Sequence, residues 1–392
     1  MSVSDQEIIS RFPVGYYPLH PNPVLNFQMN RFCGWVGEQQ MLEELRAAGP
    51  RIASFADWIK VMLELSDKAL TEGRLLPAAY YARMAHFFLT PGDPRQEPAL
   101  RRFMDNVLPG NGVTPDDHHM VPCLQGQLSA YRLTPEQPRG VIVVFGGYDS
   151  YIEEWLPAAV ALRDAGLDTV VFNGPGQGTV LDAGMPMTPD WHLPVAAILD
   201  YFGLSGVTLL GFSLGGCLVI RATAREPRIA RAITWDICTD FYGAMARNLA
   251  SAGLDAIMAN SGQIPAPVLN AAFAEAAKTD LLTDWVVFRQ GTLVMGAATP
   301  ADVLKAWREY HTSDISAQVT QDVLLMAGTT DIAIPFHMLP DQLLTLTAAR
   351  SVTARVFTEA EQASNHCQAG NAGLGLKVIF DWLDEVGGRT AA

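Results

Sequence analysis

Five short apolar runs recur between residues 140 and 328, and helical stretches separate them. Each run is rich in β-branched residues and ends in glycine or a polar residue. Buried strands that alternate with helices are typical of a parallel sheet covered on both faces. Before them, residues 117–133 (DHHMVPCLQGQLSAYRL) predict a strand pair that enters the sheet. The five runs are GVIVVFGG, DTVVFNGPG, VTLLGFS, AITWD and VLLMAG.

The first part of the chain has a helical pattern. Residues 54–89 place apolar side chains at helical spacing on both sides of a glycine break, which predicts two helices. Ser54 is of a type that caps a helix N-terminus. The aromatic residues of this region allow two interpretations: they fill a core shared by two antiparallel helices, or some of them face a substrate cavity. These residues are Tyr80, Tyr81, Phe87 and Phe88.

The change of pattern predicts the domain organisation. Residues 108–122 (LPGNGVTPDDHHMVP) are suited to connect an N-terminal helical domain, residues 1–120, to an α/β catalytic domain, residues 121–392. Residues 239–319 are too many for one crossover and are rich in alanine. They predict a helical lid inserted over the carboxyl ends of the strands, where open α/β sheets bind ligands.

Composition and charge exclude several classes of protein. The 392 residues exceed one small domain, and 49% hydrophobic with 17% charged residues favours a large core over disorder. The formal net charge of −14 lacks the basic excess that binding to a phosphate backbone requires. We therefore expect a small-molecule partner and no nucleic acid.

Features tied to cellular location favour the cytoplasm. The first ten residues, MSVSDQEIIS, have neither the basic nor the apolar region of a secretory signal. No stretch approaches 18 uncharged apolar residues, so we expect no membrane association. The five cysteines are odd in number and form no CxxC pair, which favours free thiols in a reducing compartment.

The sequence GFSLGG, residues 211–216, joins the VTLLGFS run to an apolar helical stretch. A serine between a strand and a helix must adopt a strained turn, and flanking glycines let the two backbones approach. Such a turn exposes the serine hydroxyl and places the next N–H groups at a helix N-terminus, where an oxyanion is stabilised. Ser213 is therefore the predicted nucleophile, and the N–H of Leu214 is a predicted oxyanion donor.

A serine nucleophile needs a base, and the base needs an acid that orients it. In sheets of this kind the chain order is serine, acid, histidine. Asp331 follows the VLLMAG run and His366 lies in a polar loop before the last helix, so both match that order. Alternatives for the acid are Asp236 and Asp240; alternatives for the base are His337, His311, His118 and His119.

Two glycine-rich turns bear on the remaining chemistry. The GVIVVFGG run ends at Gly147, and the backbone N–H of Gly147 or Tyr148 is the predicted second oxyanion donor. The sequence NGPGQG, residues 173–178, has neither the Lys-Ser/Thr of a phosphate loop nor the spacing of a dinucleotide site. No cluster has metal-ligand spacing. We therefore expect neither a metal nor a cofactor.

Taken in order, these motifs resemble a known family, the α/β hydrolases with an N-terminal helical domain. Within it, the chain is similar to 2,6-dihydroxypseudooxynicotine hydrolase and to fungal pigment-pathway hydrolases that shorten polyketides by C–C cleavage. The resemblance covers nearly the whole chain. One departure is Asn173, where an aspartate would be expected, and the inserted lid has no matching motif. The resemblance is carried by EGRLLPAAYYARMAHFF, FGGYDSYIEEW, NGPGQG, GFSLGG, AGTTDIAIP and NHCQAGN.

The resemblance implies an α/β-hydrolase fold, a triad of Ser213, Asp331 and His366, and a homodimer. It also implies aryl ketone, β-diketone or ester substrates, held between the helical domain and the sheet. Hydrolysis through an acyl-enzyme is the leading hypothesis. Transfer or cyclisation of the acyl group, or release of a thioester-borne chain, by the same triad is the alternative. C–C cleavage calls for an extra acid; the candidates are Asp240, Tyr242, Glu153 and Glu154, although the two glutamates would also suit a helix N-terminus.

Overall fold

The computed structural model describes residues 4–90, 92–124, 126–148 and 150–389. Its centre is an eight-stranded sheet with the order β1-β2-β4-β3-β5-β6-β7-β8. The β1–β2 and β2–β4 pairs are antiparallel and all other neighbours are parallel, which confirms the predicted α/β class. The strands are β1 (His118–Cys123), β2 (Gly126–Leu133), β3 (Gly140–Phe145), β4 (Leu167–Asn173), β5 (Val207–Phe212), β6 (Ile229–Trp235), β7 (Asp322–Gly328) and β8 (Ser351–Phe357).

Both faces of the central strands are buried, because successive side chains of these strands enter different cores. In β3, Ile142 and Val144 join a core shared with the N-terminal helices, α7 and α18. Val143 and Phe145 of the same strand join a second core shared with α9, α10 and the inserted helices. The bounds of these helices are α7 (Leu156–Asp164), α9 (His192–Phe202), α10 (Gly215–Thr223) and α18 (Ala372–Arg389).

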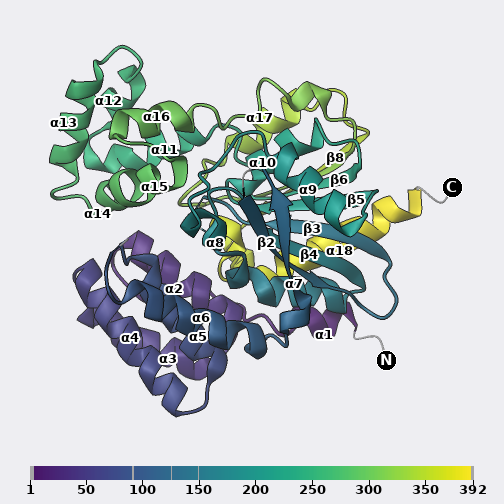
Figure 1. Ribbon diagram of the computed structural model, residues 1–392, viewed down its shortest axis with the longest axis horizontal. Helices are drawn as coiled ribbons and strands as arrows, with labels where there is room; N and C mark the ends of the chain where they lie inside the picture. The colour runs from purple at the N-terminus through teal and green to yellow at the C-terminus, as the bar shows by residue number, and fades with distance from the viewer. Residues whose placement is uncertain (1–3, 91, 125, 149, 390–392) are drawn as a thin grey trace.

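The helices of the N-terminal region pack together on one side of the sheet (Figure 1). As predicted, Ser54 caps the fourth helix, since its hydroxyl accepts the N–H of Asp57 at 3.1 Å. The first short helix contacts α18 and α7 of the α/β part instead. These helices are α1 (Asp5–Ile9), α2 (Pro23–Val36), α3 (Gln39–Ala48), α4 (Phe55–Thr71), α5 (Leu75–Phe87) and α6 (Gln96–Gly110).

The insertion between β6 and β7 is helical and forms a separate lobe, green in Figure 1. One stretch, Asp284–Gly291, is a π-helix, a rare conformation that is frequent at functional sites. The other members are α11 (Phe241–Leu249), α12 (Asp255–Asn260), α13 (Ala266–Ala276), α14 (Leu281–Thr283), α15 (Thr292–Met295) and α16 (Pro300–Trp307). The remaining helices of the α/β part are α8 (Gly178–Asp182) and α17 (Met338–Thr345).

Two properties bear on location. Within the described part of the chain, no helix combines the length and the apolar character needed to cross a bilayer. The five cysteines are all buried as free thiols.

Candidate active site

Ser213 stands at the sharp turn from β5 into α10. Its φ of +60° lies in the left-handed region, which strains a residue with a side chain. The flanking glycines are needed there: a Cβ on Gly211 would collide with the carbonyl oxygen of Gly215, and a Cβ on Gly216 with that of Asp236. The turn expected from the GFSLGG sequence is therefore present.

The structure brings the three predicted triad residues together from distant points of the chain. The Nε2 of His366 lies 2.8 Å from the Oγ of Ser213, and its Nδ1 lies 2.8 Å from the Oδ2 of Asp331. Asp331 follows β7, and its Oδ1 accepts the N–H groups of Ala333 at 2.6 Å and Ile334 at 2.8 Å. These bonds fix the carboxylate so that it can orient the imidazole.

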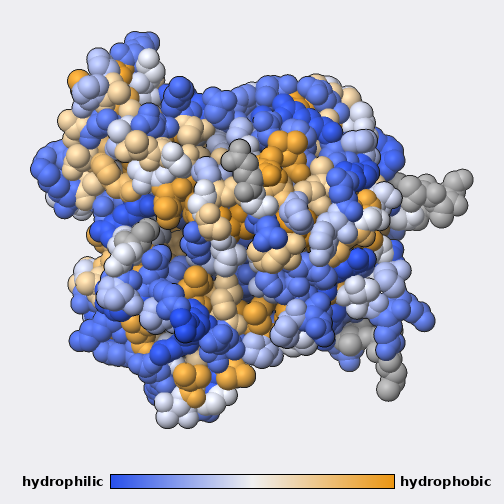
Figure 2. All heavy atoms as spheres, viewed as in Figure 1, coloured by the Kyte–Doolittle hydropathy of each residue, from blue (hydrophilic) through white to orange (hydrophobic). Residues whose placement is uncertain are grey.

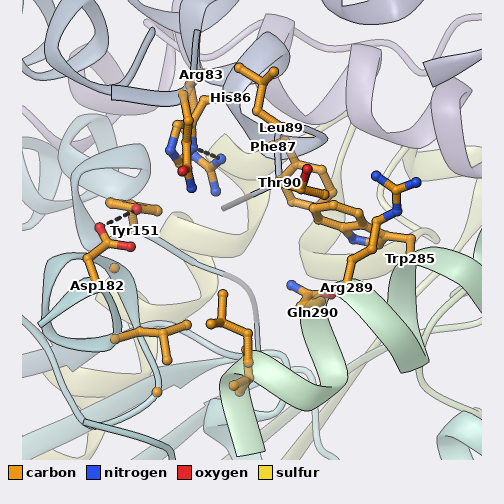
Figure 3. A pocket seen from close by; sticks show the side chains of 16 residues that line it. Arg83, His86, Phe87, Leu89, Thr90, Tyr151, Asp182, Trp285, Arg289 and Gln290 are labelled. Atoms are coloured by element: carbon orange, nitrogen blue, oxygen red, sulfur yellow. Dashed lines mark hydrogen bonds between the residues drawn. The ribbon is translucent and has the colours of Figure 1, made fainter. Parts of the chain in front are cut away.

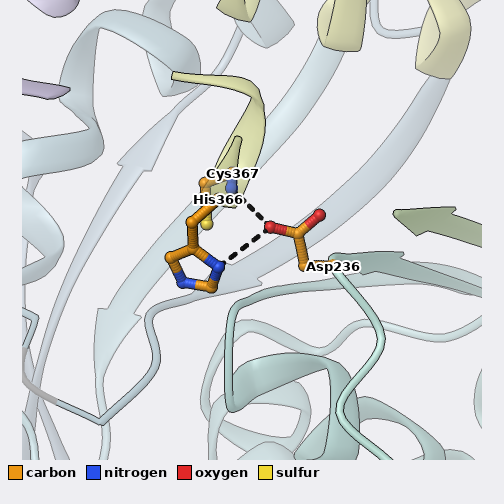
Figure 4. Close-up of side chains that lie close together, drawn as sticks. All are labelled: Asp236, His366 and Cys367. Atoms are coloured by element: carbon orange, nitrogen blue, oxygen red, sulfur yellow. Dashed lines mark hydrogen bonds and ion pairs between the residues drawn. The ribbon is translucent and has the colours of Figure 1, made fainter. Parts of the chain in front are cut away.

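A second carboxylate approaches the same imidazole nitrogen. Asp236, which follows β6 and was the alternative acid, has its Oδ2 3.2 Å from the Nδ1 of His366 (Figure 4). The same oxygen accepts the backbone N–H of Cys367, and Oδ1 accepts Nε2 of Gln368 at 2.9 Å. Asp331 is closer to His366, while Asp236 mainly fixes the backbone that carries the histidine.

The buried carboxylates alter the proton affinity of His366. Burial alone would lower the pKa of His366, but the negative charge of Asp331 and the hydrogen bond with Asp236 raise it well above its usual value. Burial also raises the pKa of the neighbouring Cys367 thiol, to about 11. The imidazolium form of His366 is thus stabilised, as proton transfer from a serine requires.

Asp236, His366 and Cys367 also form a group with metal-ligand character. Among the described residues, theirs are the only three such side chains whose ligand atoms lie within 4.8 Å of one another. A metal would bind the thiolate, whereas the raised pKa keeps Cys367 protonated, and His366 already shares its Nδ1 with Asp331. The group therefore fits a hydrogen-bonded support for His366 better than a metal site.

The predicted oxyanion donors lie beside the turn. A Cβ on Gly147 would come within 2.9 Å of the Ser213 Cβ, so this strand end is packed directly against the serine. The Gly147 N–H donates to Ser150 Oγ at 3.3 Å, while the Leu214 N–H has no acceptor among the described residues. Tyr148 lines the same cavity as Ser213.

A cavity of about 770 Å³ opens above Ser213, within the usual size of a small-molecule site. The sheet loops, the N-terminal helices and the lid all contribute to its wall, and apolar residues gather along the seam between the two helical lobes (Figure 2). Its aromatic lining is Phe27, Phe55, Phe87, Phe88, Tyr148, Trp155, Phe241 and Trp285, and its ionisable lining includes Arg31, Arg247, Asp280 and His366.

The comparison with solved structures bears on the fold. The structure named AbyA5 wild type superposes with a TM-score of 0.65 at 19% identity, covering 92% of this chain and 95% of that one. The crystal structure of 2,6-dihydroxy-pseudo-oxynicotine hydrolase gives 0.55 at 21% identity, covering 85% and 88%. The chain has the α/β-hydrolase fold. The fold that the sequence motifs implied is thus confirmed.

The sequence of this α/β-hydrolase-fold chain is also similar to hydrolases. Hydrolyase poxO of Penicillium oxalicum is 27% identical over 277 residues, a match that spans 63% of this chain and only 65% of that relative's length. The 20-hydroxy-prefusarin hydrolase FUS2 of Gibberella moniliformis is 27% identical over 351 residues, 78% of this chain and 79% of the relative. No family model matches the chain.

The predicted extra acids do not lie on the cavity of Ser213. Asp240 faces another hollow, beside Asp331, and Tyr242 donates to the carbonyl of Met258 at 2.5 Å inside the lid. Glu154 is wholly buried and pairs with two arginines, Arg31 and Arg83. The lining of the Ser213 cavity therefore does not include these three residues, and Tyr242 and Glu154 are held by other partners.

Glu153 and Glu154 do lie in the first turn of a helix, the short 3-10 helix of residues 152–155, and both are completely buried. Glu153 accepts the hydroxyl of Tyr131 at 3.0 Å and the amide of Asn173 at 3.2 Å. Asn173 also accepts the N–H of Ile152 at 2.8 Å. These hydrogen bonds join the NGPGQG turn to this helix. They give a structural role to Asn173, which stands where an aspartate was expected.

Glu154→Gln is expected to destabilise the fold by about 3–5 kcal/mol, since it removes the buried carboxylate that Arg31 and Arg83 share. Glu153→Gln is the matched control: the same change in the adjacent, equally buried residue removes no ion pair and should cost about 1 kcal/mol. Urea denaturation followed by circular dichroism measures both. An equal decrease in the free energy of unfolding in the two variants would contradict the argument that the ion pairs of Glu154 stabilise the fold.

The alternative bases lie away from Ser213. His337 is at the N-cap of α17 and is exposed. The Nδ1 of His311 lies 2.9 Å from the hydroxyl of Ser313. The remaining two are on β1, where the ring of His118 lies tilted against Tyr131 and that of His119 meets Phe202 edge to face.

Sequence reasoning missed several residues of the site. Gln177, in the NGPGQG turn, donates from Nε2 to the carbonyls of Gly146 at 2.7 Å and Gly147 at 3.0 Å, and so holds the oxyanion strand end. Its only signal was its place among glycines after a strand. Phe27, on α2, lies 5.8 Å from the ring of His366 between ring centroids. Of the four aromatic residues with two interpretations, Phe87 and Phe88 line the cavity, whereas Tyr80 and Tyr81 fill the core.

Proposed function

We propose that the chain is a serine hydrolase that cleaves an ester or an activated C–C bond in an aromatic or polyketide-like small molecule. The observation that carries the proposal is the hydrogen-bonded series Ser213–His366–Asp331 at the base of a large aromatic cavity. The relatives named as hydrolases, FUS2 among them, support the reaction class. The homodimer expected from the resemblance stays part of the proposal.

In the proposed reaction, His366 takes the proton of Ser213 as Oγ attacks a substrate carbonyl. The N–H groups of Leu214 and of Tyr148 or Gly147 receive the negative charge that develops on the carbonyl oxygen. Collapse of the tetrahedral intermediate expels the leaving group and forms an acyl-enzyme. Water, deprotonated by His366, then releases the acid and restores Ser213.

C–C cleavage adds one requirement, because the leaving carbanion must be protonated. The carboxylates first considered for this step lie elsewhere, so the proposal assigns it to the His366 imidazolium that the first step creates. The two buried carboxylates that raise the pKa of His366 favour that imidazolium. Only a carbanion stabilised by a carbonyl or phenol can leave in this way, which limits C–C substrates to β-diketones and aryl ketones.

Acyl transfer is a second candidate, since the cavity is lined largely by apolar side chains that would exclude water. Turnover of a model ester or thioester in ¹⁸O-water separates the two. Hydrolysis must place label in the acid product, and we expect close to one labelled oxygen per turnover. Unlabelled acyl product on a hydroxyl acceptor, with no labelled acid, would identify a transferase or cyclase.

A further inference from the structure

A second, smaller pocket lies beside the cavity of Ser213 and is built from all three parts of the chain. It encloses about 80 Å³ and is lined by α5, by the NGPGQG turn with α8, and by the π-helix of the lid. Phe87, Trp285 and Gln290 line both this pocket and the larger cavity. The two spaces therefore adjoin at these side chains.

The wall of this second pocket carries three buried polar side chains and one exposed carboxylate, that of Asp182. His86 and Arg83 project from α5 on one side, and Tyr151 and Asp182 face them from the other (Figure 3). The hydroxyl of Tyr151 donates to Asp182 Oδ2 at 2.6 Å. His86 and Arg83 are 6% and 2% exposed, so these polar groups are fixed parts of the interior.

The hydrogen bonds of His86 determine what it offers to a ligand. Nη1 of Arg83 lies 3.1 Å from Nδ1 of His86, and because a guanidinium can only donate, Nδ1 must be the acceptor. Burial and the charge of Arg83 lower the pKa of His86 to about 3, so the ring is neutral and its proton is on Nε2. Nε2 is buried and has no hydrogen-bond partner among the described residues.

A buried donor without an acceptor is costly, and native structures seldom keep one without a reason. The pocket is too small for a whole substrate, since a single water molecule occupies about 30 Å³ in liquid water. It does have room for the terminal group of a chain.

We propose that this pocket is a specificity subsite in which Nε2–H of His86 binds an acceptor oxygen, a carbonyl or carboxylate, at the far end of the substrate. The body of the substrate then fills the aromatic cavity and its reactive carbonyl reaches Ser213. This inference rests on the proposed function for the role of Ser213, but the binding of the far end does not require turnover. It narrows the substrate class to elongated molecules that are oxygenated at the end remote from the bond cleaved.

Binding is the primary test, and the Ser213→Ala variant is used so that no ligand is consumed. Phenyl alkyl ketones of a series of chain lengths, ending in a methyl, keto or carboxylate group, are titrated while tryptophan fluorescence is followed, since Trp285 lines both spaces. We expect Kd for the oxygenated members of adequate length to be about tenfold lower than for the methyl members, the value of one good hydrogen bond. Comparison of Kd between the keto-ended and the carboxylate-ended ketones shows whether the subsite prefers a carbonyl or a carboxylate oxygen.

His86→Phe, added to Ser213→Ala, should abolish the preference while leaving the affinity for methyl-ended ketones intact. His86→Gln keeps an N–H donor and should restore part of the preference, which a purely structural role would not predict. His118→Phe is the control, because it makes the same change in a histidine of β1 that pairs with the hydroxyl of Ser129 and lies outside both spaces. If the two His86 variants and the control show the same ratio of affinities, the subsite is refuted.

Hydrolysis of the matching esters by the wild-type chain distinguishes failure of the two proposals. Turnover without any preference for oxygenated ends, in binding or in kcat/KM, would overturn the subsite and leave the serine hydrolase proposal intact. An oxygen preference in binding without turnover of any ester, thioester or β-diketone would support the subsite and overturn the serine hydrolase proposal.

Discussion

Ser213→Ala is expected to lower kcat/KM for any cleaved substrate by about 10⁴- to 10⁶-fold, the loss that removal of a serine nucleophile causes in triad enzymes. The physical reason is that the Oγ 2.8 Å from His366 is the only atom of the arrangement that can form the acyl bond. The measurement is steady-state kinetics on a chromogenic ester, with fluorophosphonate labelling as an independent readout.

Labelling provides the sharper control. Wild-type protein should react at one site, the Ser213→Ala variant should not react, and Ser129→Ala should react normally. Ser129 is another serine beside a histidine, but it is buried, and its hydroxyl lies 2.9 Å from His118 on the far edge of the sheet. Equal labelling of wild type and Ser213→Ala would show that the nucleophile lies elsewhere.

The sequence was most informative where local geometry leaves few choices. The turn at Ser213 needs glycine at positions where a Cβ would strike a carbonyl, so the motif and the structure correspond residue by residue. The continuous apolar strands were recognisable because both of their faces are buried. β8 was missed for the opposite reason: its sequence SVTARVF is partly exposed at the edge of the sheet and lacks an apolar run.

The parts that could not be predicted depend on contacts between distant segments. Nothing local distinguishes Glu154 from a surface glutamate, since its partners Arg31 and Arg83 come from α2 and α5. The same holds for Phe27 beside His366, and for Asp236, which meets the imidazole because the loop after β8 contacts β7 and β6 lies next to β7. The chain order serine, acid, histidine identified the triad candidates, but the shape of the cavity arises from how the lid and the N-terminal helices pack.

Asp331→Asn and Asp236→Asn are expected to lower kcat by different amounts, although both carboxylates approach Nδ1 of His366. Asp331 is held by two backbone N–H groups with its Oδ2 2.8 Å from the imidazole, so its loss should lower kcat by about 10⁴-fold through the wrong tautomer. Asp236 lies farther away at 3.2 Å and chiefly binds the backbone at Cys367. Its replacement should cost far less, about tenfold, the value of one hydrogen bond to the imidazolium.

The pH profile separates the two roles more decisively than the rates do. His366 acts as a base only when neutral, so kcat/KM rises with pH through its pKa in the free enzyme. Because the two carboxylates raise that pKa, the acidic limb of the wild-type profile should lie above the ordinary value of 6.5. Asp236→Asn removes one negative charge and should move the limb to lower pH, whereas Asp240→Asn, which follows the same strand but faces another hollow, should leave it in place. A limb that moves in Asp236→Asn but stays in place in Asp331→Asn, combined with a larger loss of kcat in Asp236→Asn, would make Asp236 the orienting acid. That result would transfer the role from the end of β7 to the end of β6, the alternative that the sequence left open.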